Sequence, residues 1–518
     1  MKKITIILVF TLSALINANA RQEADRNNVL LENDTKRSDI LDTRLSAYTA
    51  MPTNLWQWHY GNISSITFNQ FYQSGEFKTV DDFSEKYGLA FESEAIQTIA
   101  EKGWVFHGKF AFKSSVNKSA DFNMFYAKSA VGSPFRVVTQ RTGDFRVKHY
   151  GLVGGLSKYL NDKFSVGAQI DYKGDLYFRT LDTRNEQYNL TIETTGSVSY
   201  NPTTHRSLSL GLAYYYHKTT NEYTNNFKTS GSEYFLYNLN GLGDFSETEL
   251  DDHVIITDKN PKLLLSYFSG EKNKLNLLVS VYPGIDKWNN KITSLNSIKT
   301  KELFKYEYLN NNFEGSYSIS KNKYELFNKL TANVITGNGY EYRGTAYQKT
   351  YLYEGLTSAY STDLYRHNKK LFYKNKLGLG FESIRKKDMT YAQEMKYTNL
   401  TASVKTGYFI PVNSRNKLAI DAGVNYKLNL DYLHQVSAAA SKPYTTNIAY
   451  NEMAFNTADF IQVDGEAKWH GYIGKLKAEY KIRYSYTKPL DIKVVNSYSL
   501  LNTNTMKNSL SASLNIYF

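Results

Sequence analysis

The chain has 518 residues, among them 44 Tyr, 28 Phe and 5 Trp but only 8 Pro and no Cys. This composition excludes disulfides and favours β-strands. Past the first twenty residues, no run of about 18 apolar residues occurs, which excludes a transmembrane helix. The formal net charge of +13 would suggest nucleic acid as partner in a cytoplasmic chain, but the export signal described next argues against one.

The N-terminus has the three parts of a secretory signal peptide. Lys2 and Lys3 form a basic start, residues 4–16 are largely apolar, and Ala18 and Ala20 form an A-x-A cleavage site. We therefore expect residues 1–20 to be removed, and the protein to be exported to the cell envelope. No Cys follows the cleavage site, so lipidation there is not expected.

Residues 21–57 are polar and poor in aromatic side chains. We interpret them as a periplasmic N-terminal segment with one short helix near residues 34–45, and a small plug is the alternative. The remaining residues, 58–518, are assigned to a single β-barrel.

From residue 62 onward, apolar and polar residues alternate. In residues 475–487, Leu476, Tyr480 and Ile482 alternate with Lys477 and Lys481, as in a strand with one apolar and one polar face. Such stretches run for about 10–14 residues, longer than the soluble mode of about 5–6. A tilted strand that crosses a bilayer needs about 9–11. The pattern favours a membrane-spanning barrel.

The connections alternate in length, as in barrels with short periplasmic turns and long extracellular loops. Short turns are expected at 100–103, 158–163, 201–206, 270–274, 321–323, 366–369, 411–416 and 470–474. Long loops are expected at 114–143, 217–259, 285–303, 338–350, 431–457 and 488–505. With one strand before the first hairpin and one after the last, the chain is predicted to be all-β: a transmembrane antiparallel up-and-down β-barrel of about 18 strands, with 16 as the alternative.

The polar face of the predicted strands is rich in cations. These residues are His107, Lys109, Lys113, Lys374, Lys376, Lys405, Lys427, Lys475, Lys477, Lys481 and Arg483. They suggest either a basic lumen lining that concentrates anions, or a lumen filled by salt bridges to residues such as Glu382, Asp421 and Glu479. The sequence leaves both alternatives open.

No residue pattern predicts a cofactor, a metal site or a catalytic site. The nine His are scattered, and no spacing places a nucleophile beside a base. We therefore do not expect an enzyme, with an outer-membrane hydrolase as a minor alternative.

The chain ends in a regular alternating stretch, "NSLSASLNIYF". Leu510, Ala512, Leu514, Ile516 and Phe518 share one face, in the same even register as residues 418–430 and 476–486. We expect this strand to pair with the first strand and close the barrel, because hydrocarbon cannot satisfy an open edge. The same residues match the C-terminal signal that the outer-membrane assembly machinery recognises in barrels.

The stretches "NLWQWHYGNISSITFNQF" (54–71), "FRVKHYGLVGGLSKYLNDKFSVGAQIDYKGDL" (145–176) and "YNLTIETTGSVSYNPTTHRSLSLGLAYYY" (188–216) resemble an uncharacterised family of Bacteroidota-type outer-membrane β-barrels. The resemblance implies an integral outer-membrane protein, often encoded near TonB-dependent receptors.

The expected function is a channel or accessory uptake protein for a small solute or nutrient, with an anion as one option. The alternative is a plugged barrel that docks on a TonB-dependent receptor or a surface lipoprotein. In either case the expected surroundings are outer-membrane lipids and lipopolysaccharide.

Overall fold

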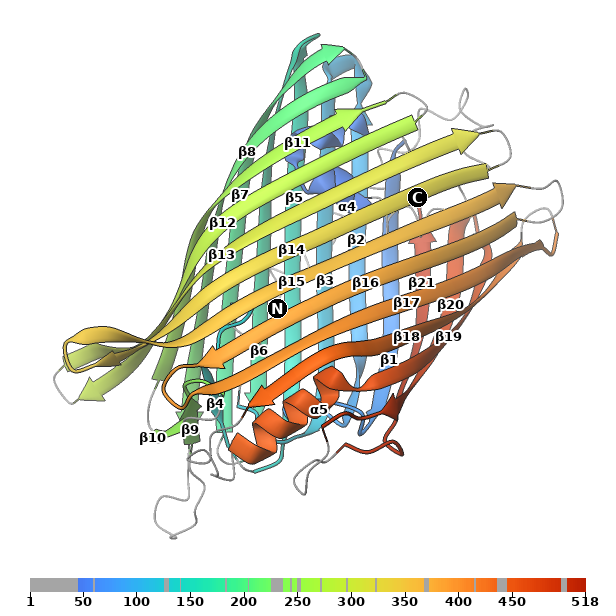
Figure 1. Cartoon of the computed structure of the whole chain (residues 1–518). Helices are drawn as coiled ribbons and strands as arrows, with labels where there is room; N and C mark the ends of the chain where they lie inside the picture. The colour runs from blue at the N-terminus through green and yellow to red at the C-terminus, as the bar shows by residue number, and fades with distance from the viewer. Residues whose placement is uncertain are drawn as a thin grey trace.

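The computed structural model describes residues 45–518 except 59–60, 125–129, 140, 182–183, 204, 225–235, 243–244, 249–252, 271–272, 295–296, 322–323, 368–371, 414–415, 436–444 and 495–500. Eighteen antiparallel strands form one closed barrel (Figure 1). The strands are β1 (Ile63–Gly75), β2 (Glu85–Ile99), β3 (Trp104–Ala120), β5 (Gly143–Asn161), β6 (Phe164–Arg179), β7 (Arg184–Thr203), β8 (Arg206–Thr224), β11 (His253–Ser269), β12 (Asn273–Ser294), β13 (Ser297–Lys321), β14 (Tyr324–Arg343), β15 (Ala346–His367), β16 (Phe372–Asp388), β17 (Gln393–Pro411), β18 (Lys417–Gln435), β19 (Asp459–Ile473), β20 (Leu476–Asp491) and β21 (Lys507–Tyr517).

The first and last strands close the barrel. Strand β1 pairs with β21 from Ser65 opposite Tyr517 to Gly75 opposite Lys507. The backbone N–H of Phe518 continues this ladder by donating to the carbonyl oxygen of Ser64 at 3.0 Å. The predicted closed antiparallel barrel of 18 strands is confirmed.

Apolar side chains cover the outside of the barrel and polar side chains the inside. Leu212, Val404 and Ile482 are 67%, 58% and 58% exposed, whereas inward residues such as Asp421 and Glu479 are buried. Because an exposed apolar belt of this extent is stable only against lipid, the outer face is the membrane-facing one. The even register predicted for residues 418–430 and 476–486 is the outward one, with Ile420, Val424 and Tyr480 exposed.

At all eight positions where a short turn was predicted, one described strand ends and the next begins, and these strand ends lie together at one end of the barrel, which we call the short-turn end. At the opposite loop end, two predicted loops are wrong. Residues 285–303 and 338–350 mostly continue β12 to β15, with pairs as far out as Ser294 opposite Ser297 and Arg343 opposite Ala346. These extensions carry many polar residues and so read as loops, yet Trp288 and Phe304 alternate inward and are buried.

The remaining elements lie at the two ends of the barrel. Helices α4 (Leu45–Thr49) and η1 (Pro52–Gln57) precede β1, and η2 (Ala100–Lys102) forms a turn. A small sheet of β4 (Arg136–Val138), β9 (Leu236–Leu239) and β10 (Phe245–Thr248), together with η4 (Thr445–Tyr450) and α5 (Asn451–Thr457), comes from loops. Among the described residues, no helix has the length and apolar character needed to cross a membrane.

Leu379→Arg tests the outward face. Leu379 is 55% exposed in the middle of β16, and a lipid-facing arginine near the membrane midplane costs about 2–4 kcal/mol of folding free energy. Urea titration of the protein in vesicles should show this loss. Lys376→Arg, on the inner face of the same strand, should have little effect, and equal losses in both variants would contradict the assigned faces.

Candidate functional site in the barrel lumen

Most of the predicted inner-wall cations have an acidic or aromatic partner. His107 contacts Glu94 at 3.0 Å, and Lys109 contacts Glu92 at 2.7 Å. The other contacts are Lys113 on the Phe71 ring, Lys374 on the Tyr365 ring, Lys376 with Asp363 and Arg483 with Asp464. Lys477 and Lys481 are half-buried on the inner face of β20.

Four charged residues form a cluster on β17, β18 and β19. Lys405 is 3.6 Å from both Asp421 and Glu466, and Lys468 is 3.1 Å from Glu466 and 4.0 Å from Asp421. Asp421, Glu466 and Lys468 are almost inaccessible to solvent. These contacts correspond to the salt-bridged alternative for the lumen, because the charges neutralise one another across neighbouring strands.

Two of the predicted cations have other surroundings. Lys475 lies in the exposed turn between β19 and β20, so its assignment to the lumen wall is wrong. The alternation of residues 475–487 placed it in the wall, but the strand begins one residue later, at Leu476. Lys427 points inward, where its ammonium donates to the carbonyl oxygens of Asn456 at 2.7 Å and Phe455 at 3.4 Å, at the end of α5.

Residues 45–58 lie inside the barrel at the short-turn end, and we call them the wedge (Figure 1). Leu45, Tyr48, Leu55 and Trp58 pack with inward residues of the wall. Those wall residues are Ile63, Ile96, Val105 and Phe268, from β1, β2, β3 and β11. The apolar residues of the wedge therefore replace the solvent that a wide barrel would otherwise hold at this end.

Small residues of the wall make room for the wedge. A Cβ atom at Gly167 would lie 2.7 Å from the backbone of Pro52, and one at Gly211 would lie 2.9 Å from the sulfur of Met51. Polar contacts fix the register: the backbone N–H of Thr53 donates to Ser197 Oγ at 3.1 Å. Similarly, Asn54 donates its side-chain amide to Ser266 Oγ at 2.9 Å.

At the loop end, the connecting segments fold inward and form what we call the loop layer. It comprises residues 76–84, 121–142, 236–248, 445–458 and 492–506, within the described part of each loop. Its largest apolar cluster joins Phe135, Leu236 and Met453 to inward residues of the barrel strands. The strand residues in that cluster are Tyr223, Val254, Ile256, Trp288, Phe304, Tyr306, Ile335, Tyr351, Tyr353, Ile384, Met395 and Tyr397.

Arg136 on β4 links the loop layer electrostatically. Its guanidinium is 3.1 Å from Asp81 and 3.4 Å from Glu452 on α5, and Glu452 also pairs with Lys386 of β16. Burial alone would lower the pKa of Arg136, but the carboxylates of Glu452 and Asp81 raise it above its usual value. The segment before β2, the small sheet, α5 and the barrel wall thus share one ion-pair network.

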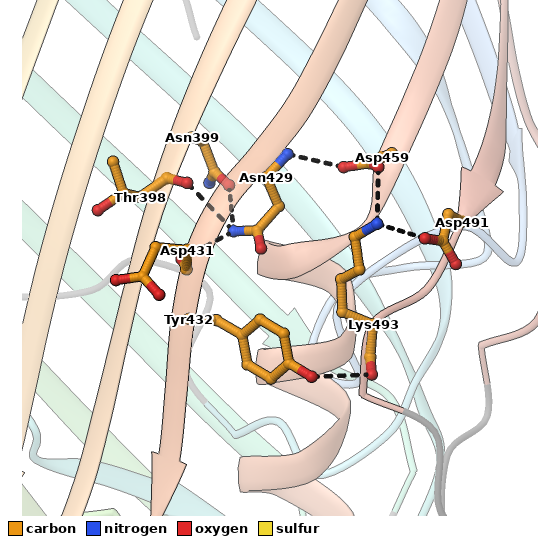
Figure 2. Close-up of polar contacts among 8 residues, drawn as sticks. All are labelled: Thr398, Asn399, Asn429, Asp431, Tyr432, Asp459, Asp491 and Lys493. Atoms are coloured by element: carbon orange, nitrogen blue, oxygen red, sulfur yellow. Dashed lines mark hydrogen bonds and ion pairs between the residues drawn. The ribbon is translucent and has the colours of Figure 1, made fainter.

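The segment that carries α5 is anchored at the rim, where β18 and β19 separate (Figure 2). The last β18–β19 pair is Lys427 opposite Phe460. Beyond it, the backbone N–H of Asn429 donates to the Asp459 carboxylate at 2.7 Å, so a side chain replaces the lost ladder partner. The Asn429 amide bonds to Asn399 at 2.9 Å, on β17.

Lys493 adds the last loop to this anchor. Its ammonium lies 3.0 Å from Asp459 and also contacts Asp491. Figure 2 shows the ammonium between these two carboxylates. Hydrogen bonds to Asp491 and Asp459 raise the pKa of Lys493. Tyr432 donates to the carbonyl oxygen of Lys493 at 3.4 Å, so β18, the start of β19 and the loop after β20 are tied together.

The inward residues of β11 show how these parts follow one another along the barrel. Nearest the short-turn end, the wedge contacts Phe268, Ser266 and Leu264. The next inward residues, Lys262, Asn260 and Asp258, line a cavity. Farthest along the strand, the loop layer packs on Ile256 and Val254. An internal polar space therefore lies between the wedge and the loop layer.

This cavity, of about 180 Å³, is built from inward side chains of β7, β8 and β11 to β14. Its lining is Ala130, Val131, Glu193, Tyr215, Asp258, Asn260, Lys262, Tyr282, Tyr308, Asn310 and Ile335. Lys262 also borders a second cavity of about 350 Å³, toward Ser280, Asn312 and Thr357. Acidic, basic, amide and phenol groups meet here, which is the lining expected of a site for a polar solute.

Among the described residues, no group of three or more His, Cys, Asp or Glu side chains is arranged to hold a metal ion. The signal peptide, its cleavage site at Ala18 and Ala20, and residues 21–44 lie outside the described residues.

The model of a family of unknown function, DUF6850, matches residues 52–518. The chain belongs to this family. The match spans the barrel of this DUF6850 chain and also includes η1 of the wedge. Among curated proteins, none matches the chain.

Several solved structures resemble the DUF6850 barrel at low identity. BauA, the ferric preacinetobactin receptor from Acinetobacter baumannii, has 9% identity and a TM-score of 0.41, over 88% of this chain and 80% of that one. FyuA, the ferric yersiniabactin uptake receptor from Yersinia pestis, has 8% identity and a TM-score of 0.42, over 88% of this chain and 80% of that one. TodX, the toluene transporter from Pseudomonas putida, has 9% identity and a TM-score of 0.28, over 92% of this chain and 93% of that one.

Proposed function

We propose that this chain is an outer-membrane uptake barrel that is gated at both ends and passes a small neutral solute when the wedge and the loop layer move. The observation that carries the proposal is the succession along β11, from wedge to polar cavity to loop layer. A barrel built only for stability would have no use for a polar cavity between two apolar closures, because buried polar groups cost free energy unless they have partners.

The outward apolar belt supports a membrane location, and closed barrels of this kind are typical of outer membranes. The surroundings in this proposal are lipids and lipopolysaccharide, and the assembly machinery recognises residues 510–518. The wedge at the short-turn end faces the periplasm, and the loop layer faces the cell exterior.

The paired charges favour a neutral solute over an anion. Lys405 and Lys468 share Asp421 and Glu466, and Lys262 lies 3.3 Å from Glu193. Cations that already have carboxylate partners add little net field along the path. Discrimination therefore rests on hydrogen bonding and size rather than on net charge.

A disulfide across the wedge tests the proposal, since the native chain has no Cys. The backbone N–H of Thr53 lies 3.1 Å from Ser197 Oγ, so Thr53→Cys with Ser197→Cys places two thiols in neighbouring residues as an oxidisable lock. In proteoliposomes, arabinose-driven swelling should stop after oxidation and return after reduction. The single Thr53→Cys variant is the control and should be insensitive to both treatments.

Swelling that is unchanged by the lock would contradict gating by the wedge. Swelling that is absent from wild type and from the reduced variant would contradict uptake altogether. It would favour the second candidate, a barrel that docks through the folded loop layer on a TonB-dependent receptor or a surface lipoprotein. The observation that favours this candidate is that β4 and α5 pack into one apolar cluster, which gives the loop layer a fixed shape.

A further inference from the structure

The cavity between wedge and loop layer contains buried hydrogen-bond acceptors that have no donor. Asn260 and Asn310 are 1% and 4% exposed, and the Oδ1 atom of each has no hydrogen bond. Asp258, 4% exposed, likewise has one carboxylate oxygen, Oδ1, without a hydrogen bond. Each such acceptor lowers the stability of the fold when it is buried without a partner. Several in one place indicate that something else supplies the donors.

The hydrogen bonds of Tyr308 fix how one of these acceptors is oriented. The Tyr308 hydroxyl donates to Asp258 Oδ2 at 2.7 Å and accepts from the amide nitrogen of Asn260 at 2.6 Å. Since the single phenolic proton is already donated to Asp258, the amide of Asn260 must present its nitrogen to Tyr308. The oxygen of Asn260 is thereby held as an acceptor.

The third side chain contacts Tyr282: Asn310 donates its amide N–H to the Tyr282 hydroxyl, which leaves the Asn310 oxygen as an acceptor. The rings of Tyr282 and Tyr308 lie 6.4 Å apart at 87°. Ala130, Val131 and Ile335 complete the lining with apolar groups. The cavity thus combines oriented acceptors with ring faces and a small apolar cap.

The charges around the cavity argue against an ion as its occupant. Lys262, 3.3 Å from Glu193, would repel a cation, while Asp258 and Glu193 would repel an anion. A neutral molecule that carries several hydroxyl groups is repelled by neither set of charges. It also suits the lining, because each hydroxyl can donate to an amide oxygen and accept from an ammonium. C–H faces of a saturated ring can pack on the tyrosines.

We propose that this cavity binds a neutral cyclic polyol the size of a single sugar ring. Asn260, Asn310 and Asp258 accept from its hydroxyls, and Lys262 donates to one of them. The adjoining cavity beyond Lys262, lined by hydroxyl and amide groups such as Ser280, Asn312 and Thr357, continues the path toward the wedge. The inference deepens the proposed function by naming its solute class, and it rests on that function.

Binding of glucose, galactose and myo-inositol to the purified protein in detergent, measured by saturation-transfer NMR and calorimetry, tests the site. Asn260→Leu and Asn310→Leu should each weaken binding about tenfold, the loss expected for one hydrogen bond. Asn515→Leu is the matched control: Asn515 is a buried inward amide on β21, 2.8 Å from Glu479 and outside the cavity. This variant should bind as wild type does.

Binding is measured in wild type and in the wedge variant Leu55→Asp, so that a closed lumen cannot hide the site. No saturable binding of any of the three polyols in either background would overturn the proposal. Saturable binding of Ca²⁺ or inorganic phosphate that Asn260→Leu abolishes would replace it with an ion site. An equal loss of polyol binding in Asn515→Leu would also contradict the proposal, because it would show that such substitutions disturb the barrel wall in general.

The binding and swelling experiments fail independently. If polyols bind but the disulfide lock does not change swelling, gated uptake is contradicted and the polyol site is not. If the lock stops swelling but no polyol binds, only the polyol site is contradicted.

Discussion

Leu55→Asp is expected to release the wedge from the lumen while the barrel stays folded. Leu55 is completely buried among Tyr48, Trp58 and Val105, and loss of such a side chain alone costs about 2–5 kcal/mol. The carboxylate adds a desolvation cost in the same apolar cluster. The strand ladders contain no wedge residue, so they should persist.

Hydrogen exchange and limited proteolysis should therefore show residues 45–58 unprotected in this variant, with the heat-modifiable band of the folded barrel retained. Gln57→Glu is the matched control, because it places the same charge two residues away at a half-buried position. Protection of the wedge in Leu55→Asp equal to that in wild type would show that the apolar contacts do not hold it.

Arg136→Leu is expected to loosen the loop layer. The variant leaves Asp81 and Glu452 without the guanidinium that each contacts, although Lys386 still pairs with Glu452. Removal of one partner from a buried ion pair costs about 3–5 kcal/mol, and we expect the lower end because these side chains keep slight solvent contact. Exchange should accelerate in β4 and α5 and not in the barrel strands.

Arg385→Leu provides the comparison, because Arg385 also bridges two carboxylates, Glu394 at 2.8 Å and Glu354 at 3.1 Å, but from a more exposed position. An exposed pair contributes about 0–1 kcal/mol. Exchange in the loop layer should therefore stay near that of wild type. The role assigned to Arg136 fails if the two variants accelerate exchange equally.

The barrel itself could be predicted because a strand with lipid on one side must alternate. Leu476, Tyr480 and Ile482 already identify the outer face in the sequence, and each short turn marks the end of a hairpin. The predicted barrel and its closure by residues 507–517 follow from these two patterns.

The extended strands were missed because alternation loses its contrast beyond the membrane. Around Lys287 and Glu302 the outer face meets water instead of lipid and carries charges, so an apolar outer row is no longer required. The inward aromatic residues Trp288, Phe304 and Tyr306 were the signal available in the sequence.

The cavity could not be predicted, since its residues come from six strands. Glu193 and Asn310 are more than a hundred positions apart and meet only through the register of the ladders from β7 to β13. A small plug was only one of two alternatives for residues 21–57, because Leu55 and Trp58 stand in a short stretch without periodicity. A cluster of Trp within residues 54–58 of an otherwise polar segment was the available hint.

Ion current through single proteins in planar bilayers tests gating at both ends most directly. Wild type should give no steady current, and a variant with both Leu55→Asp and Arg136→Leu should give a steady current with little preference for anions or cations. A steady open current from wild type, or a silent double variant that still migrates as a folded barrel, would contradict the account.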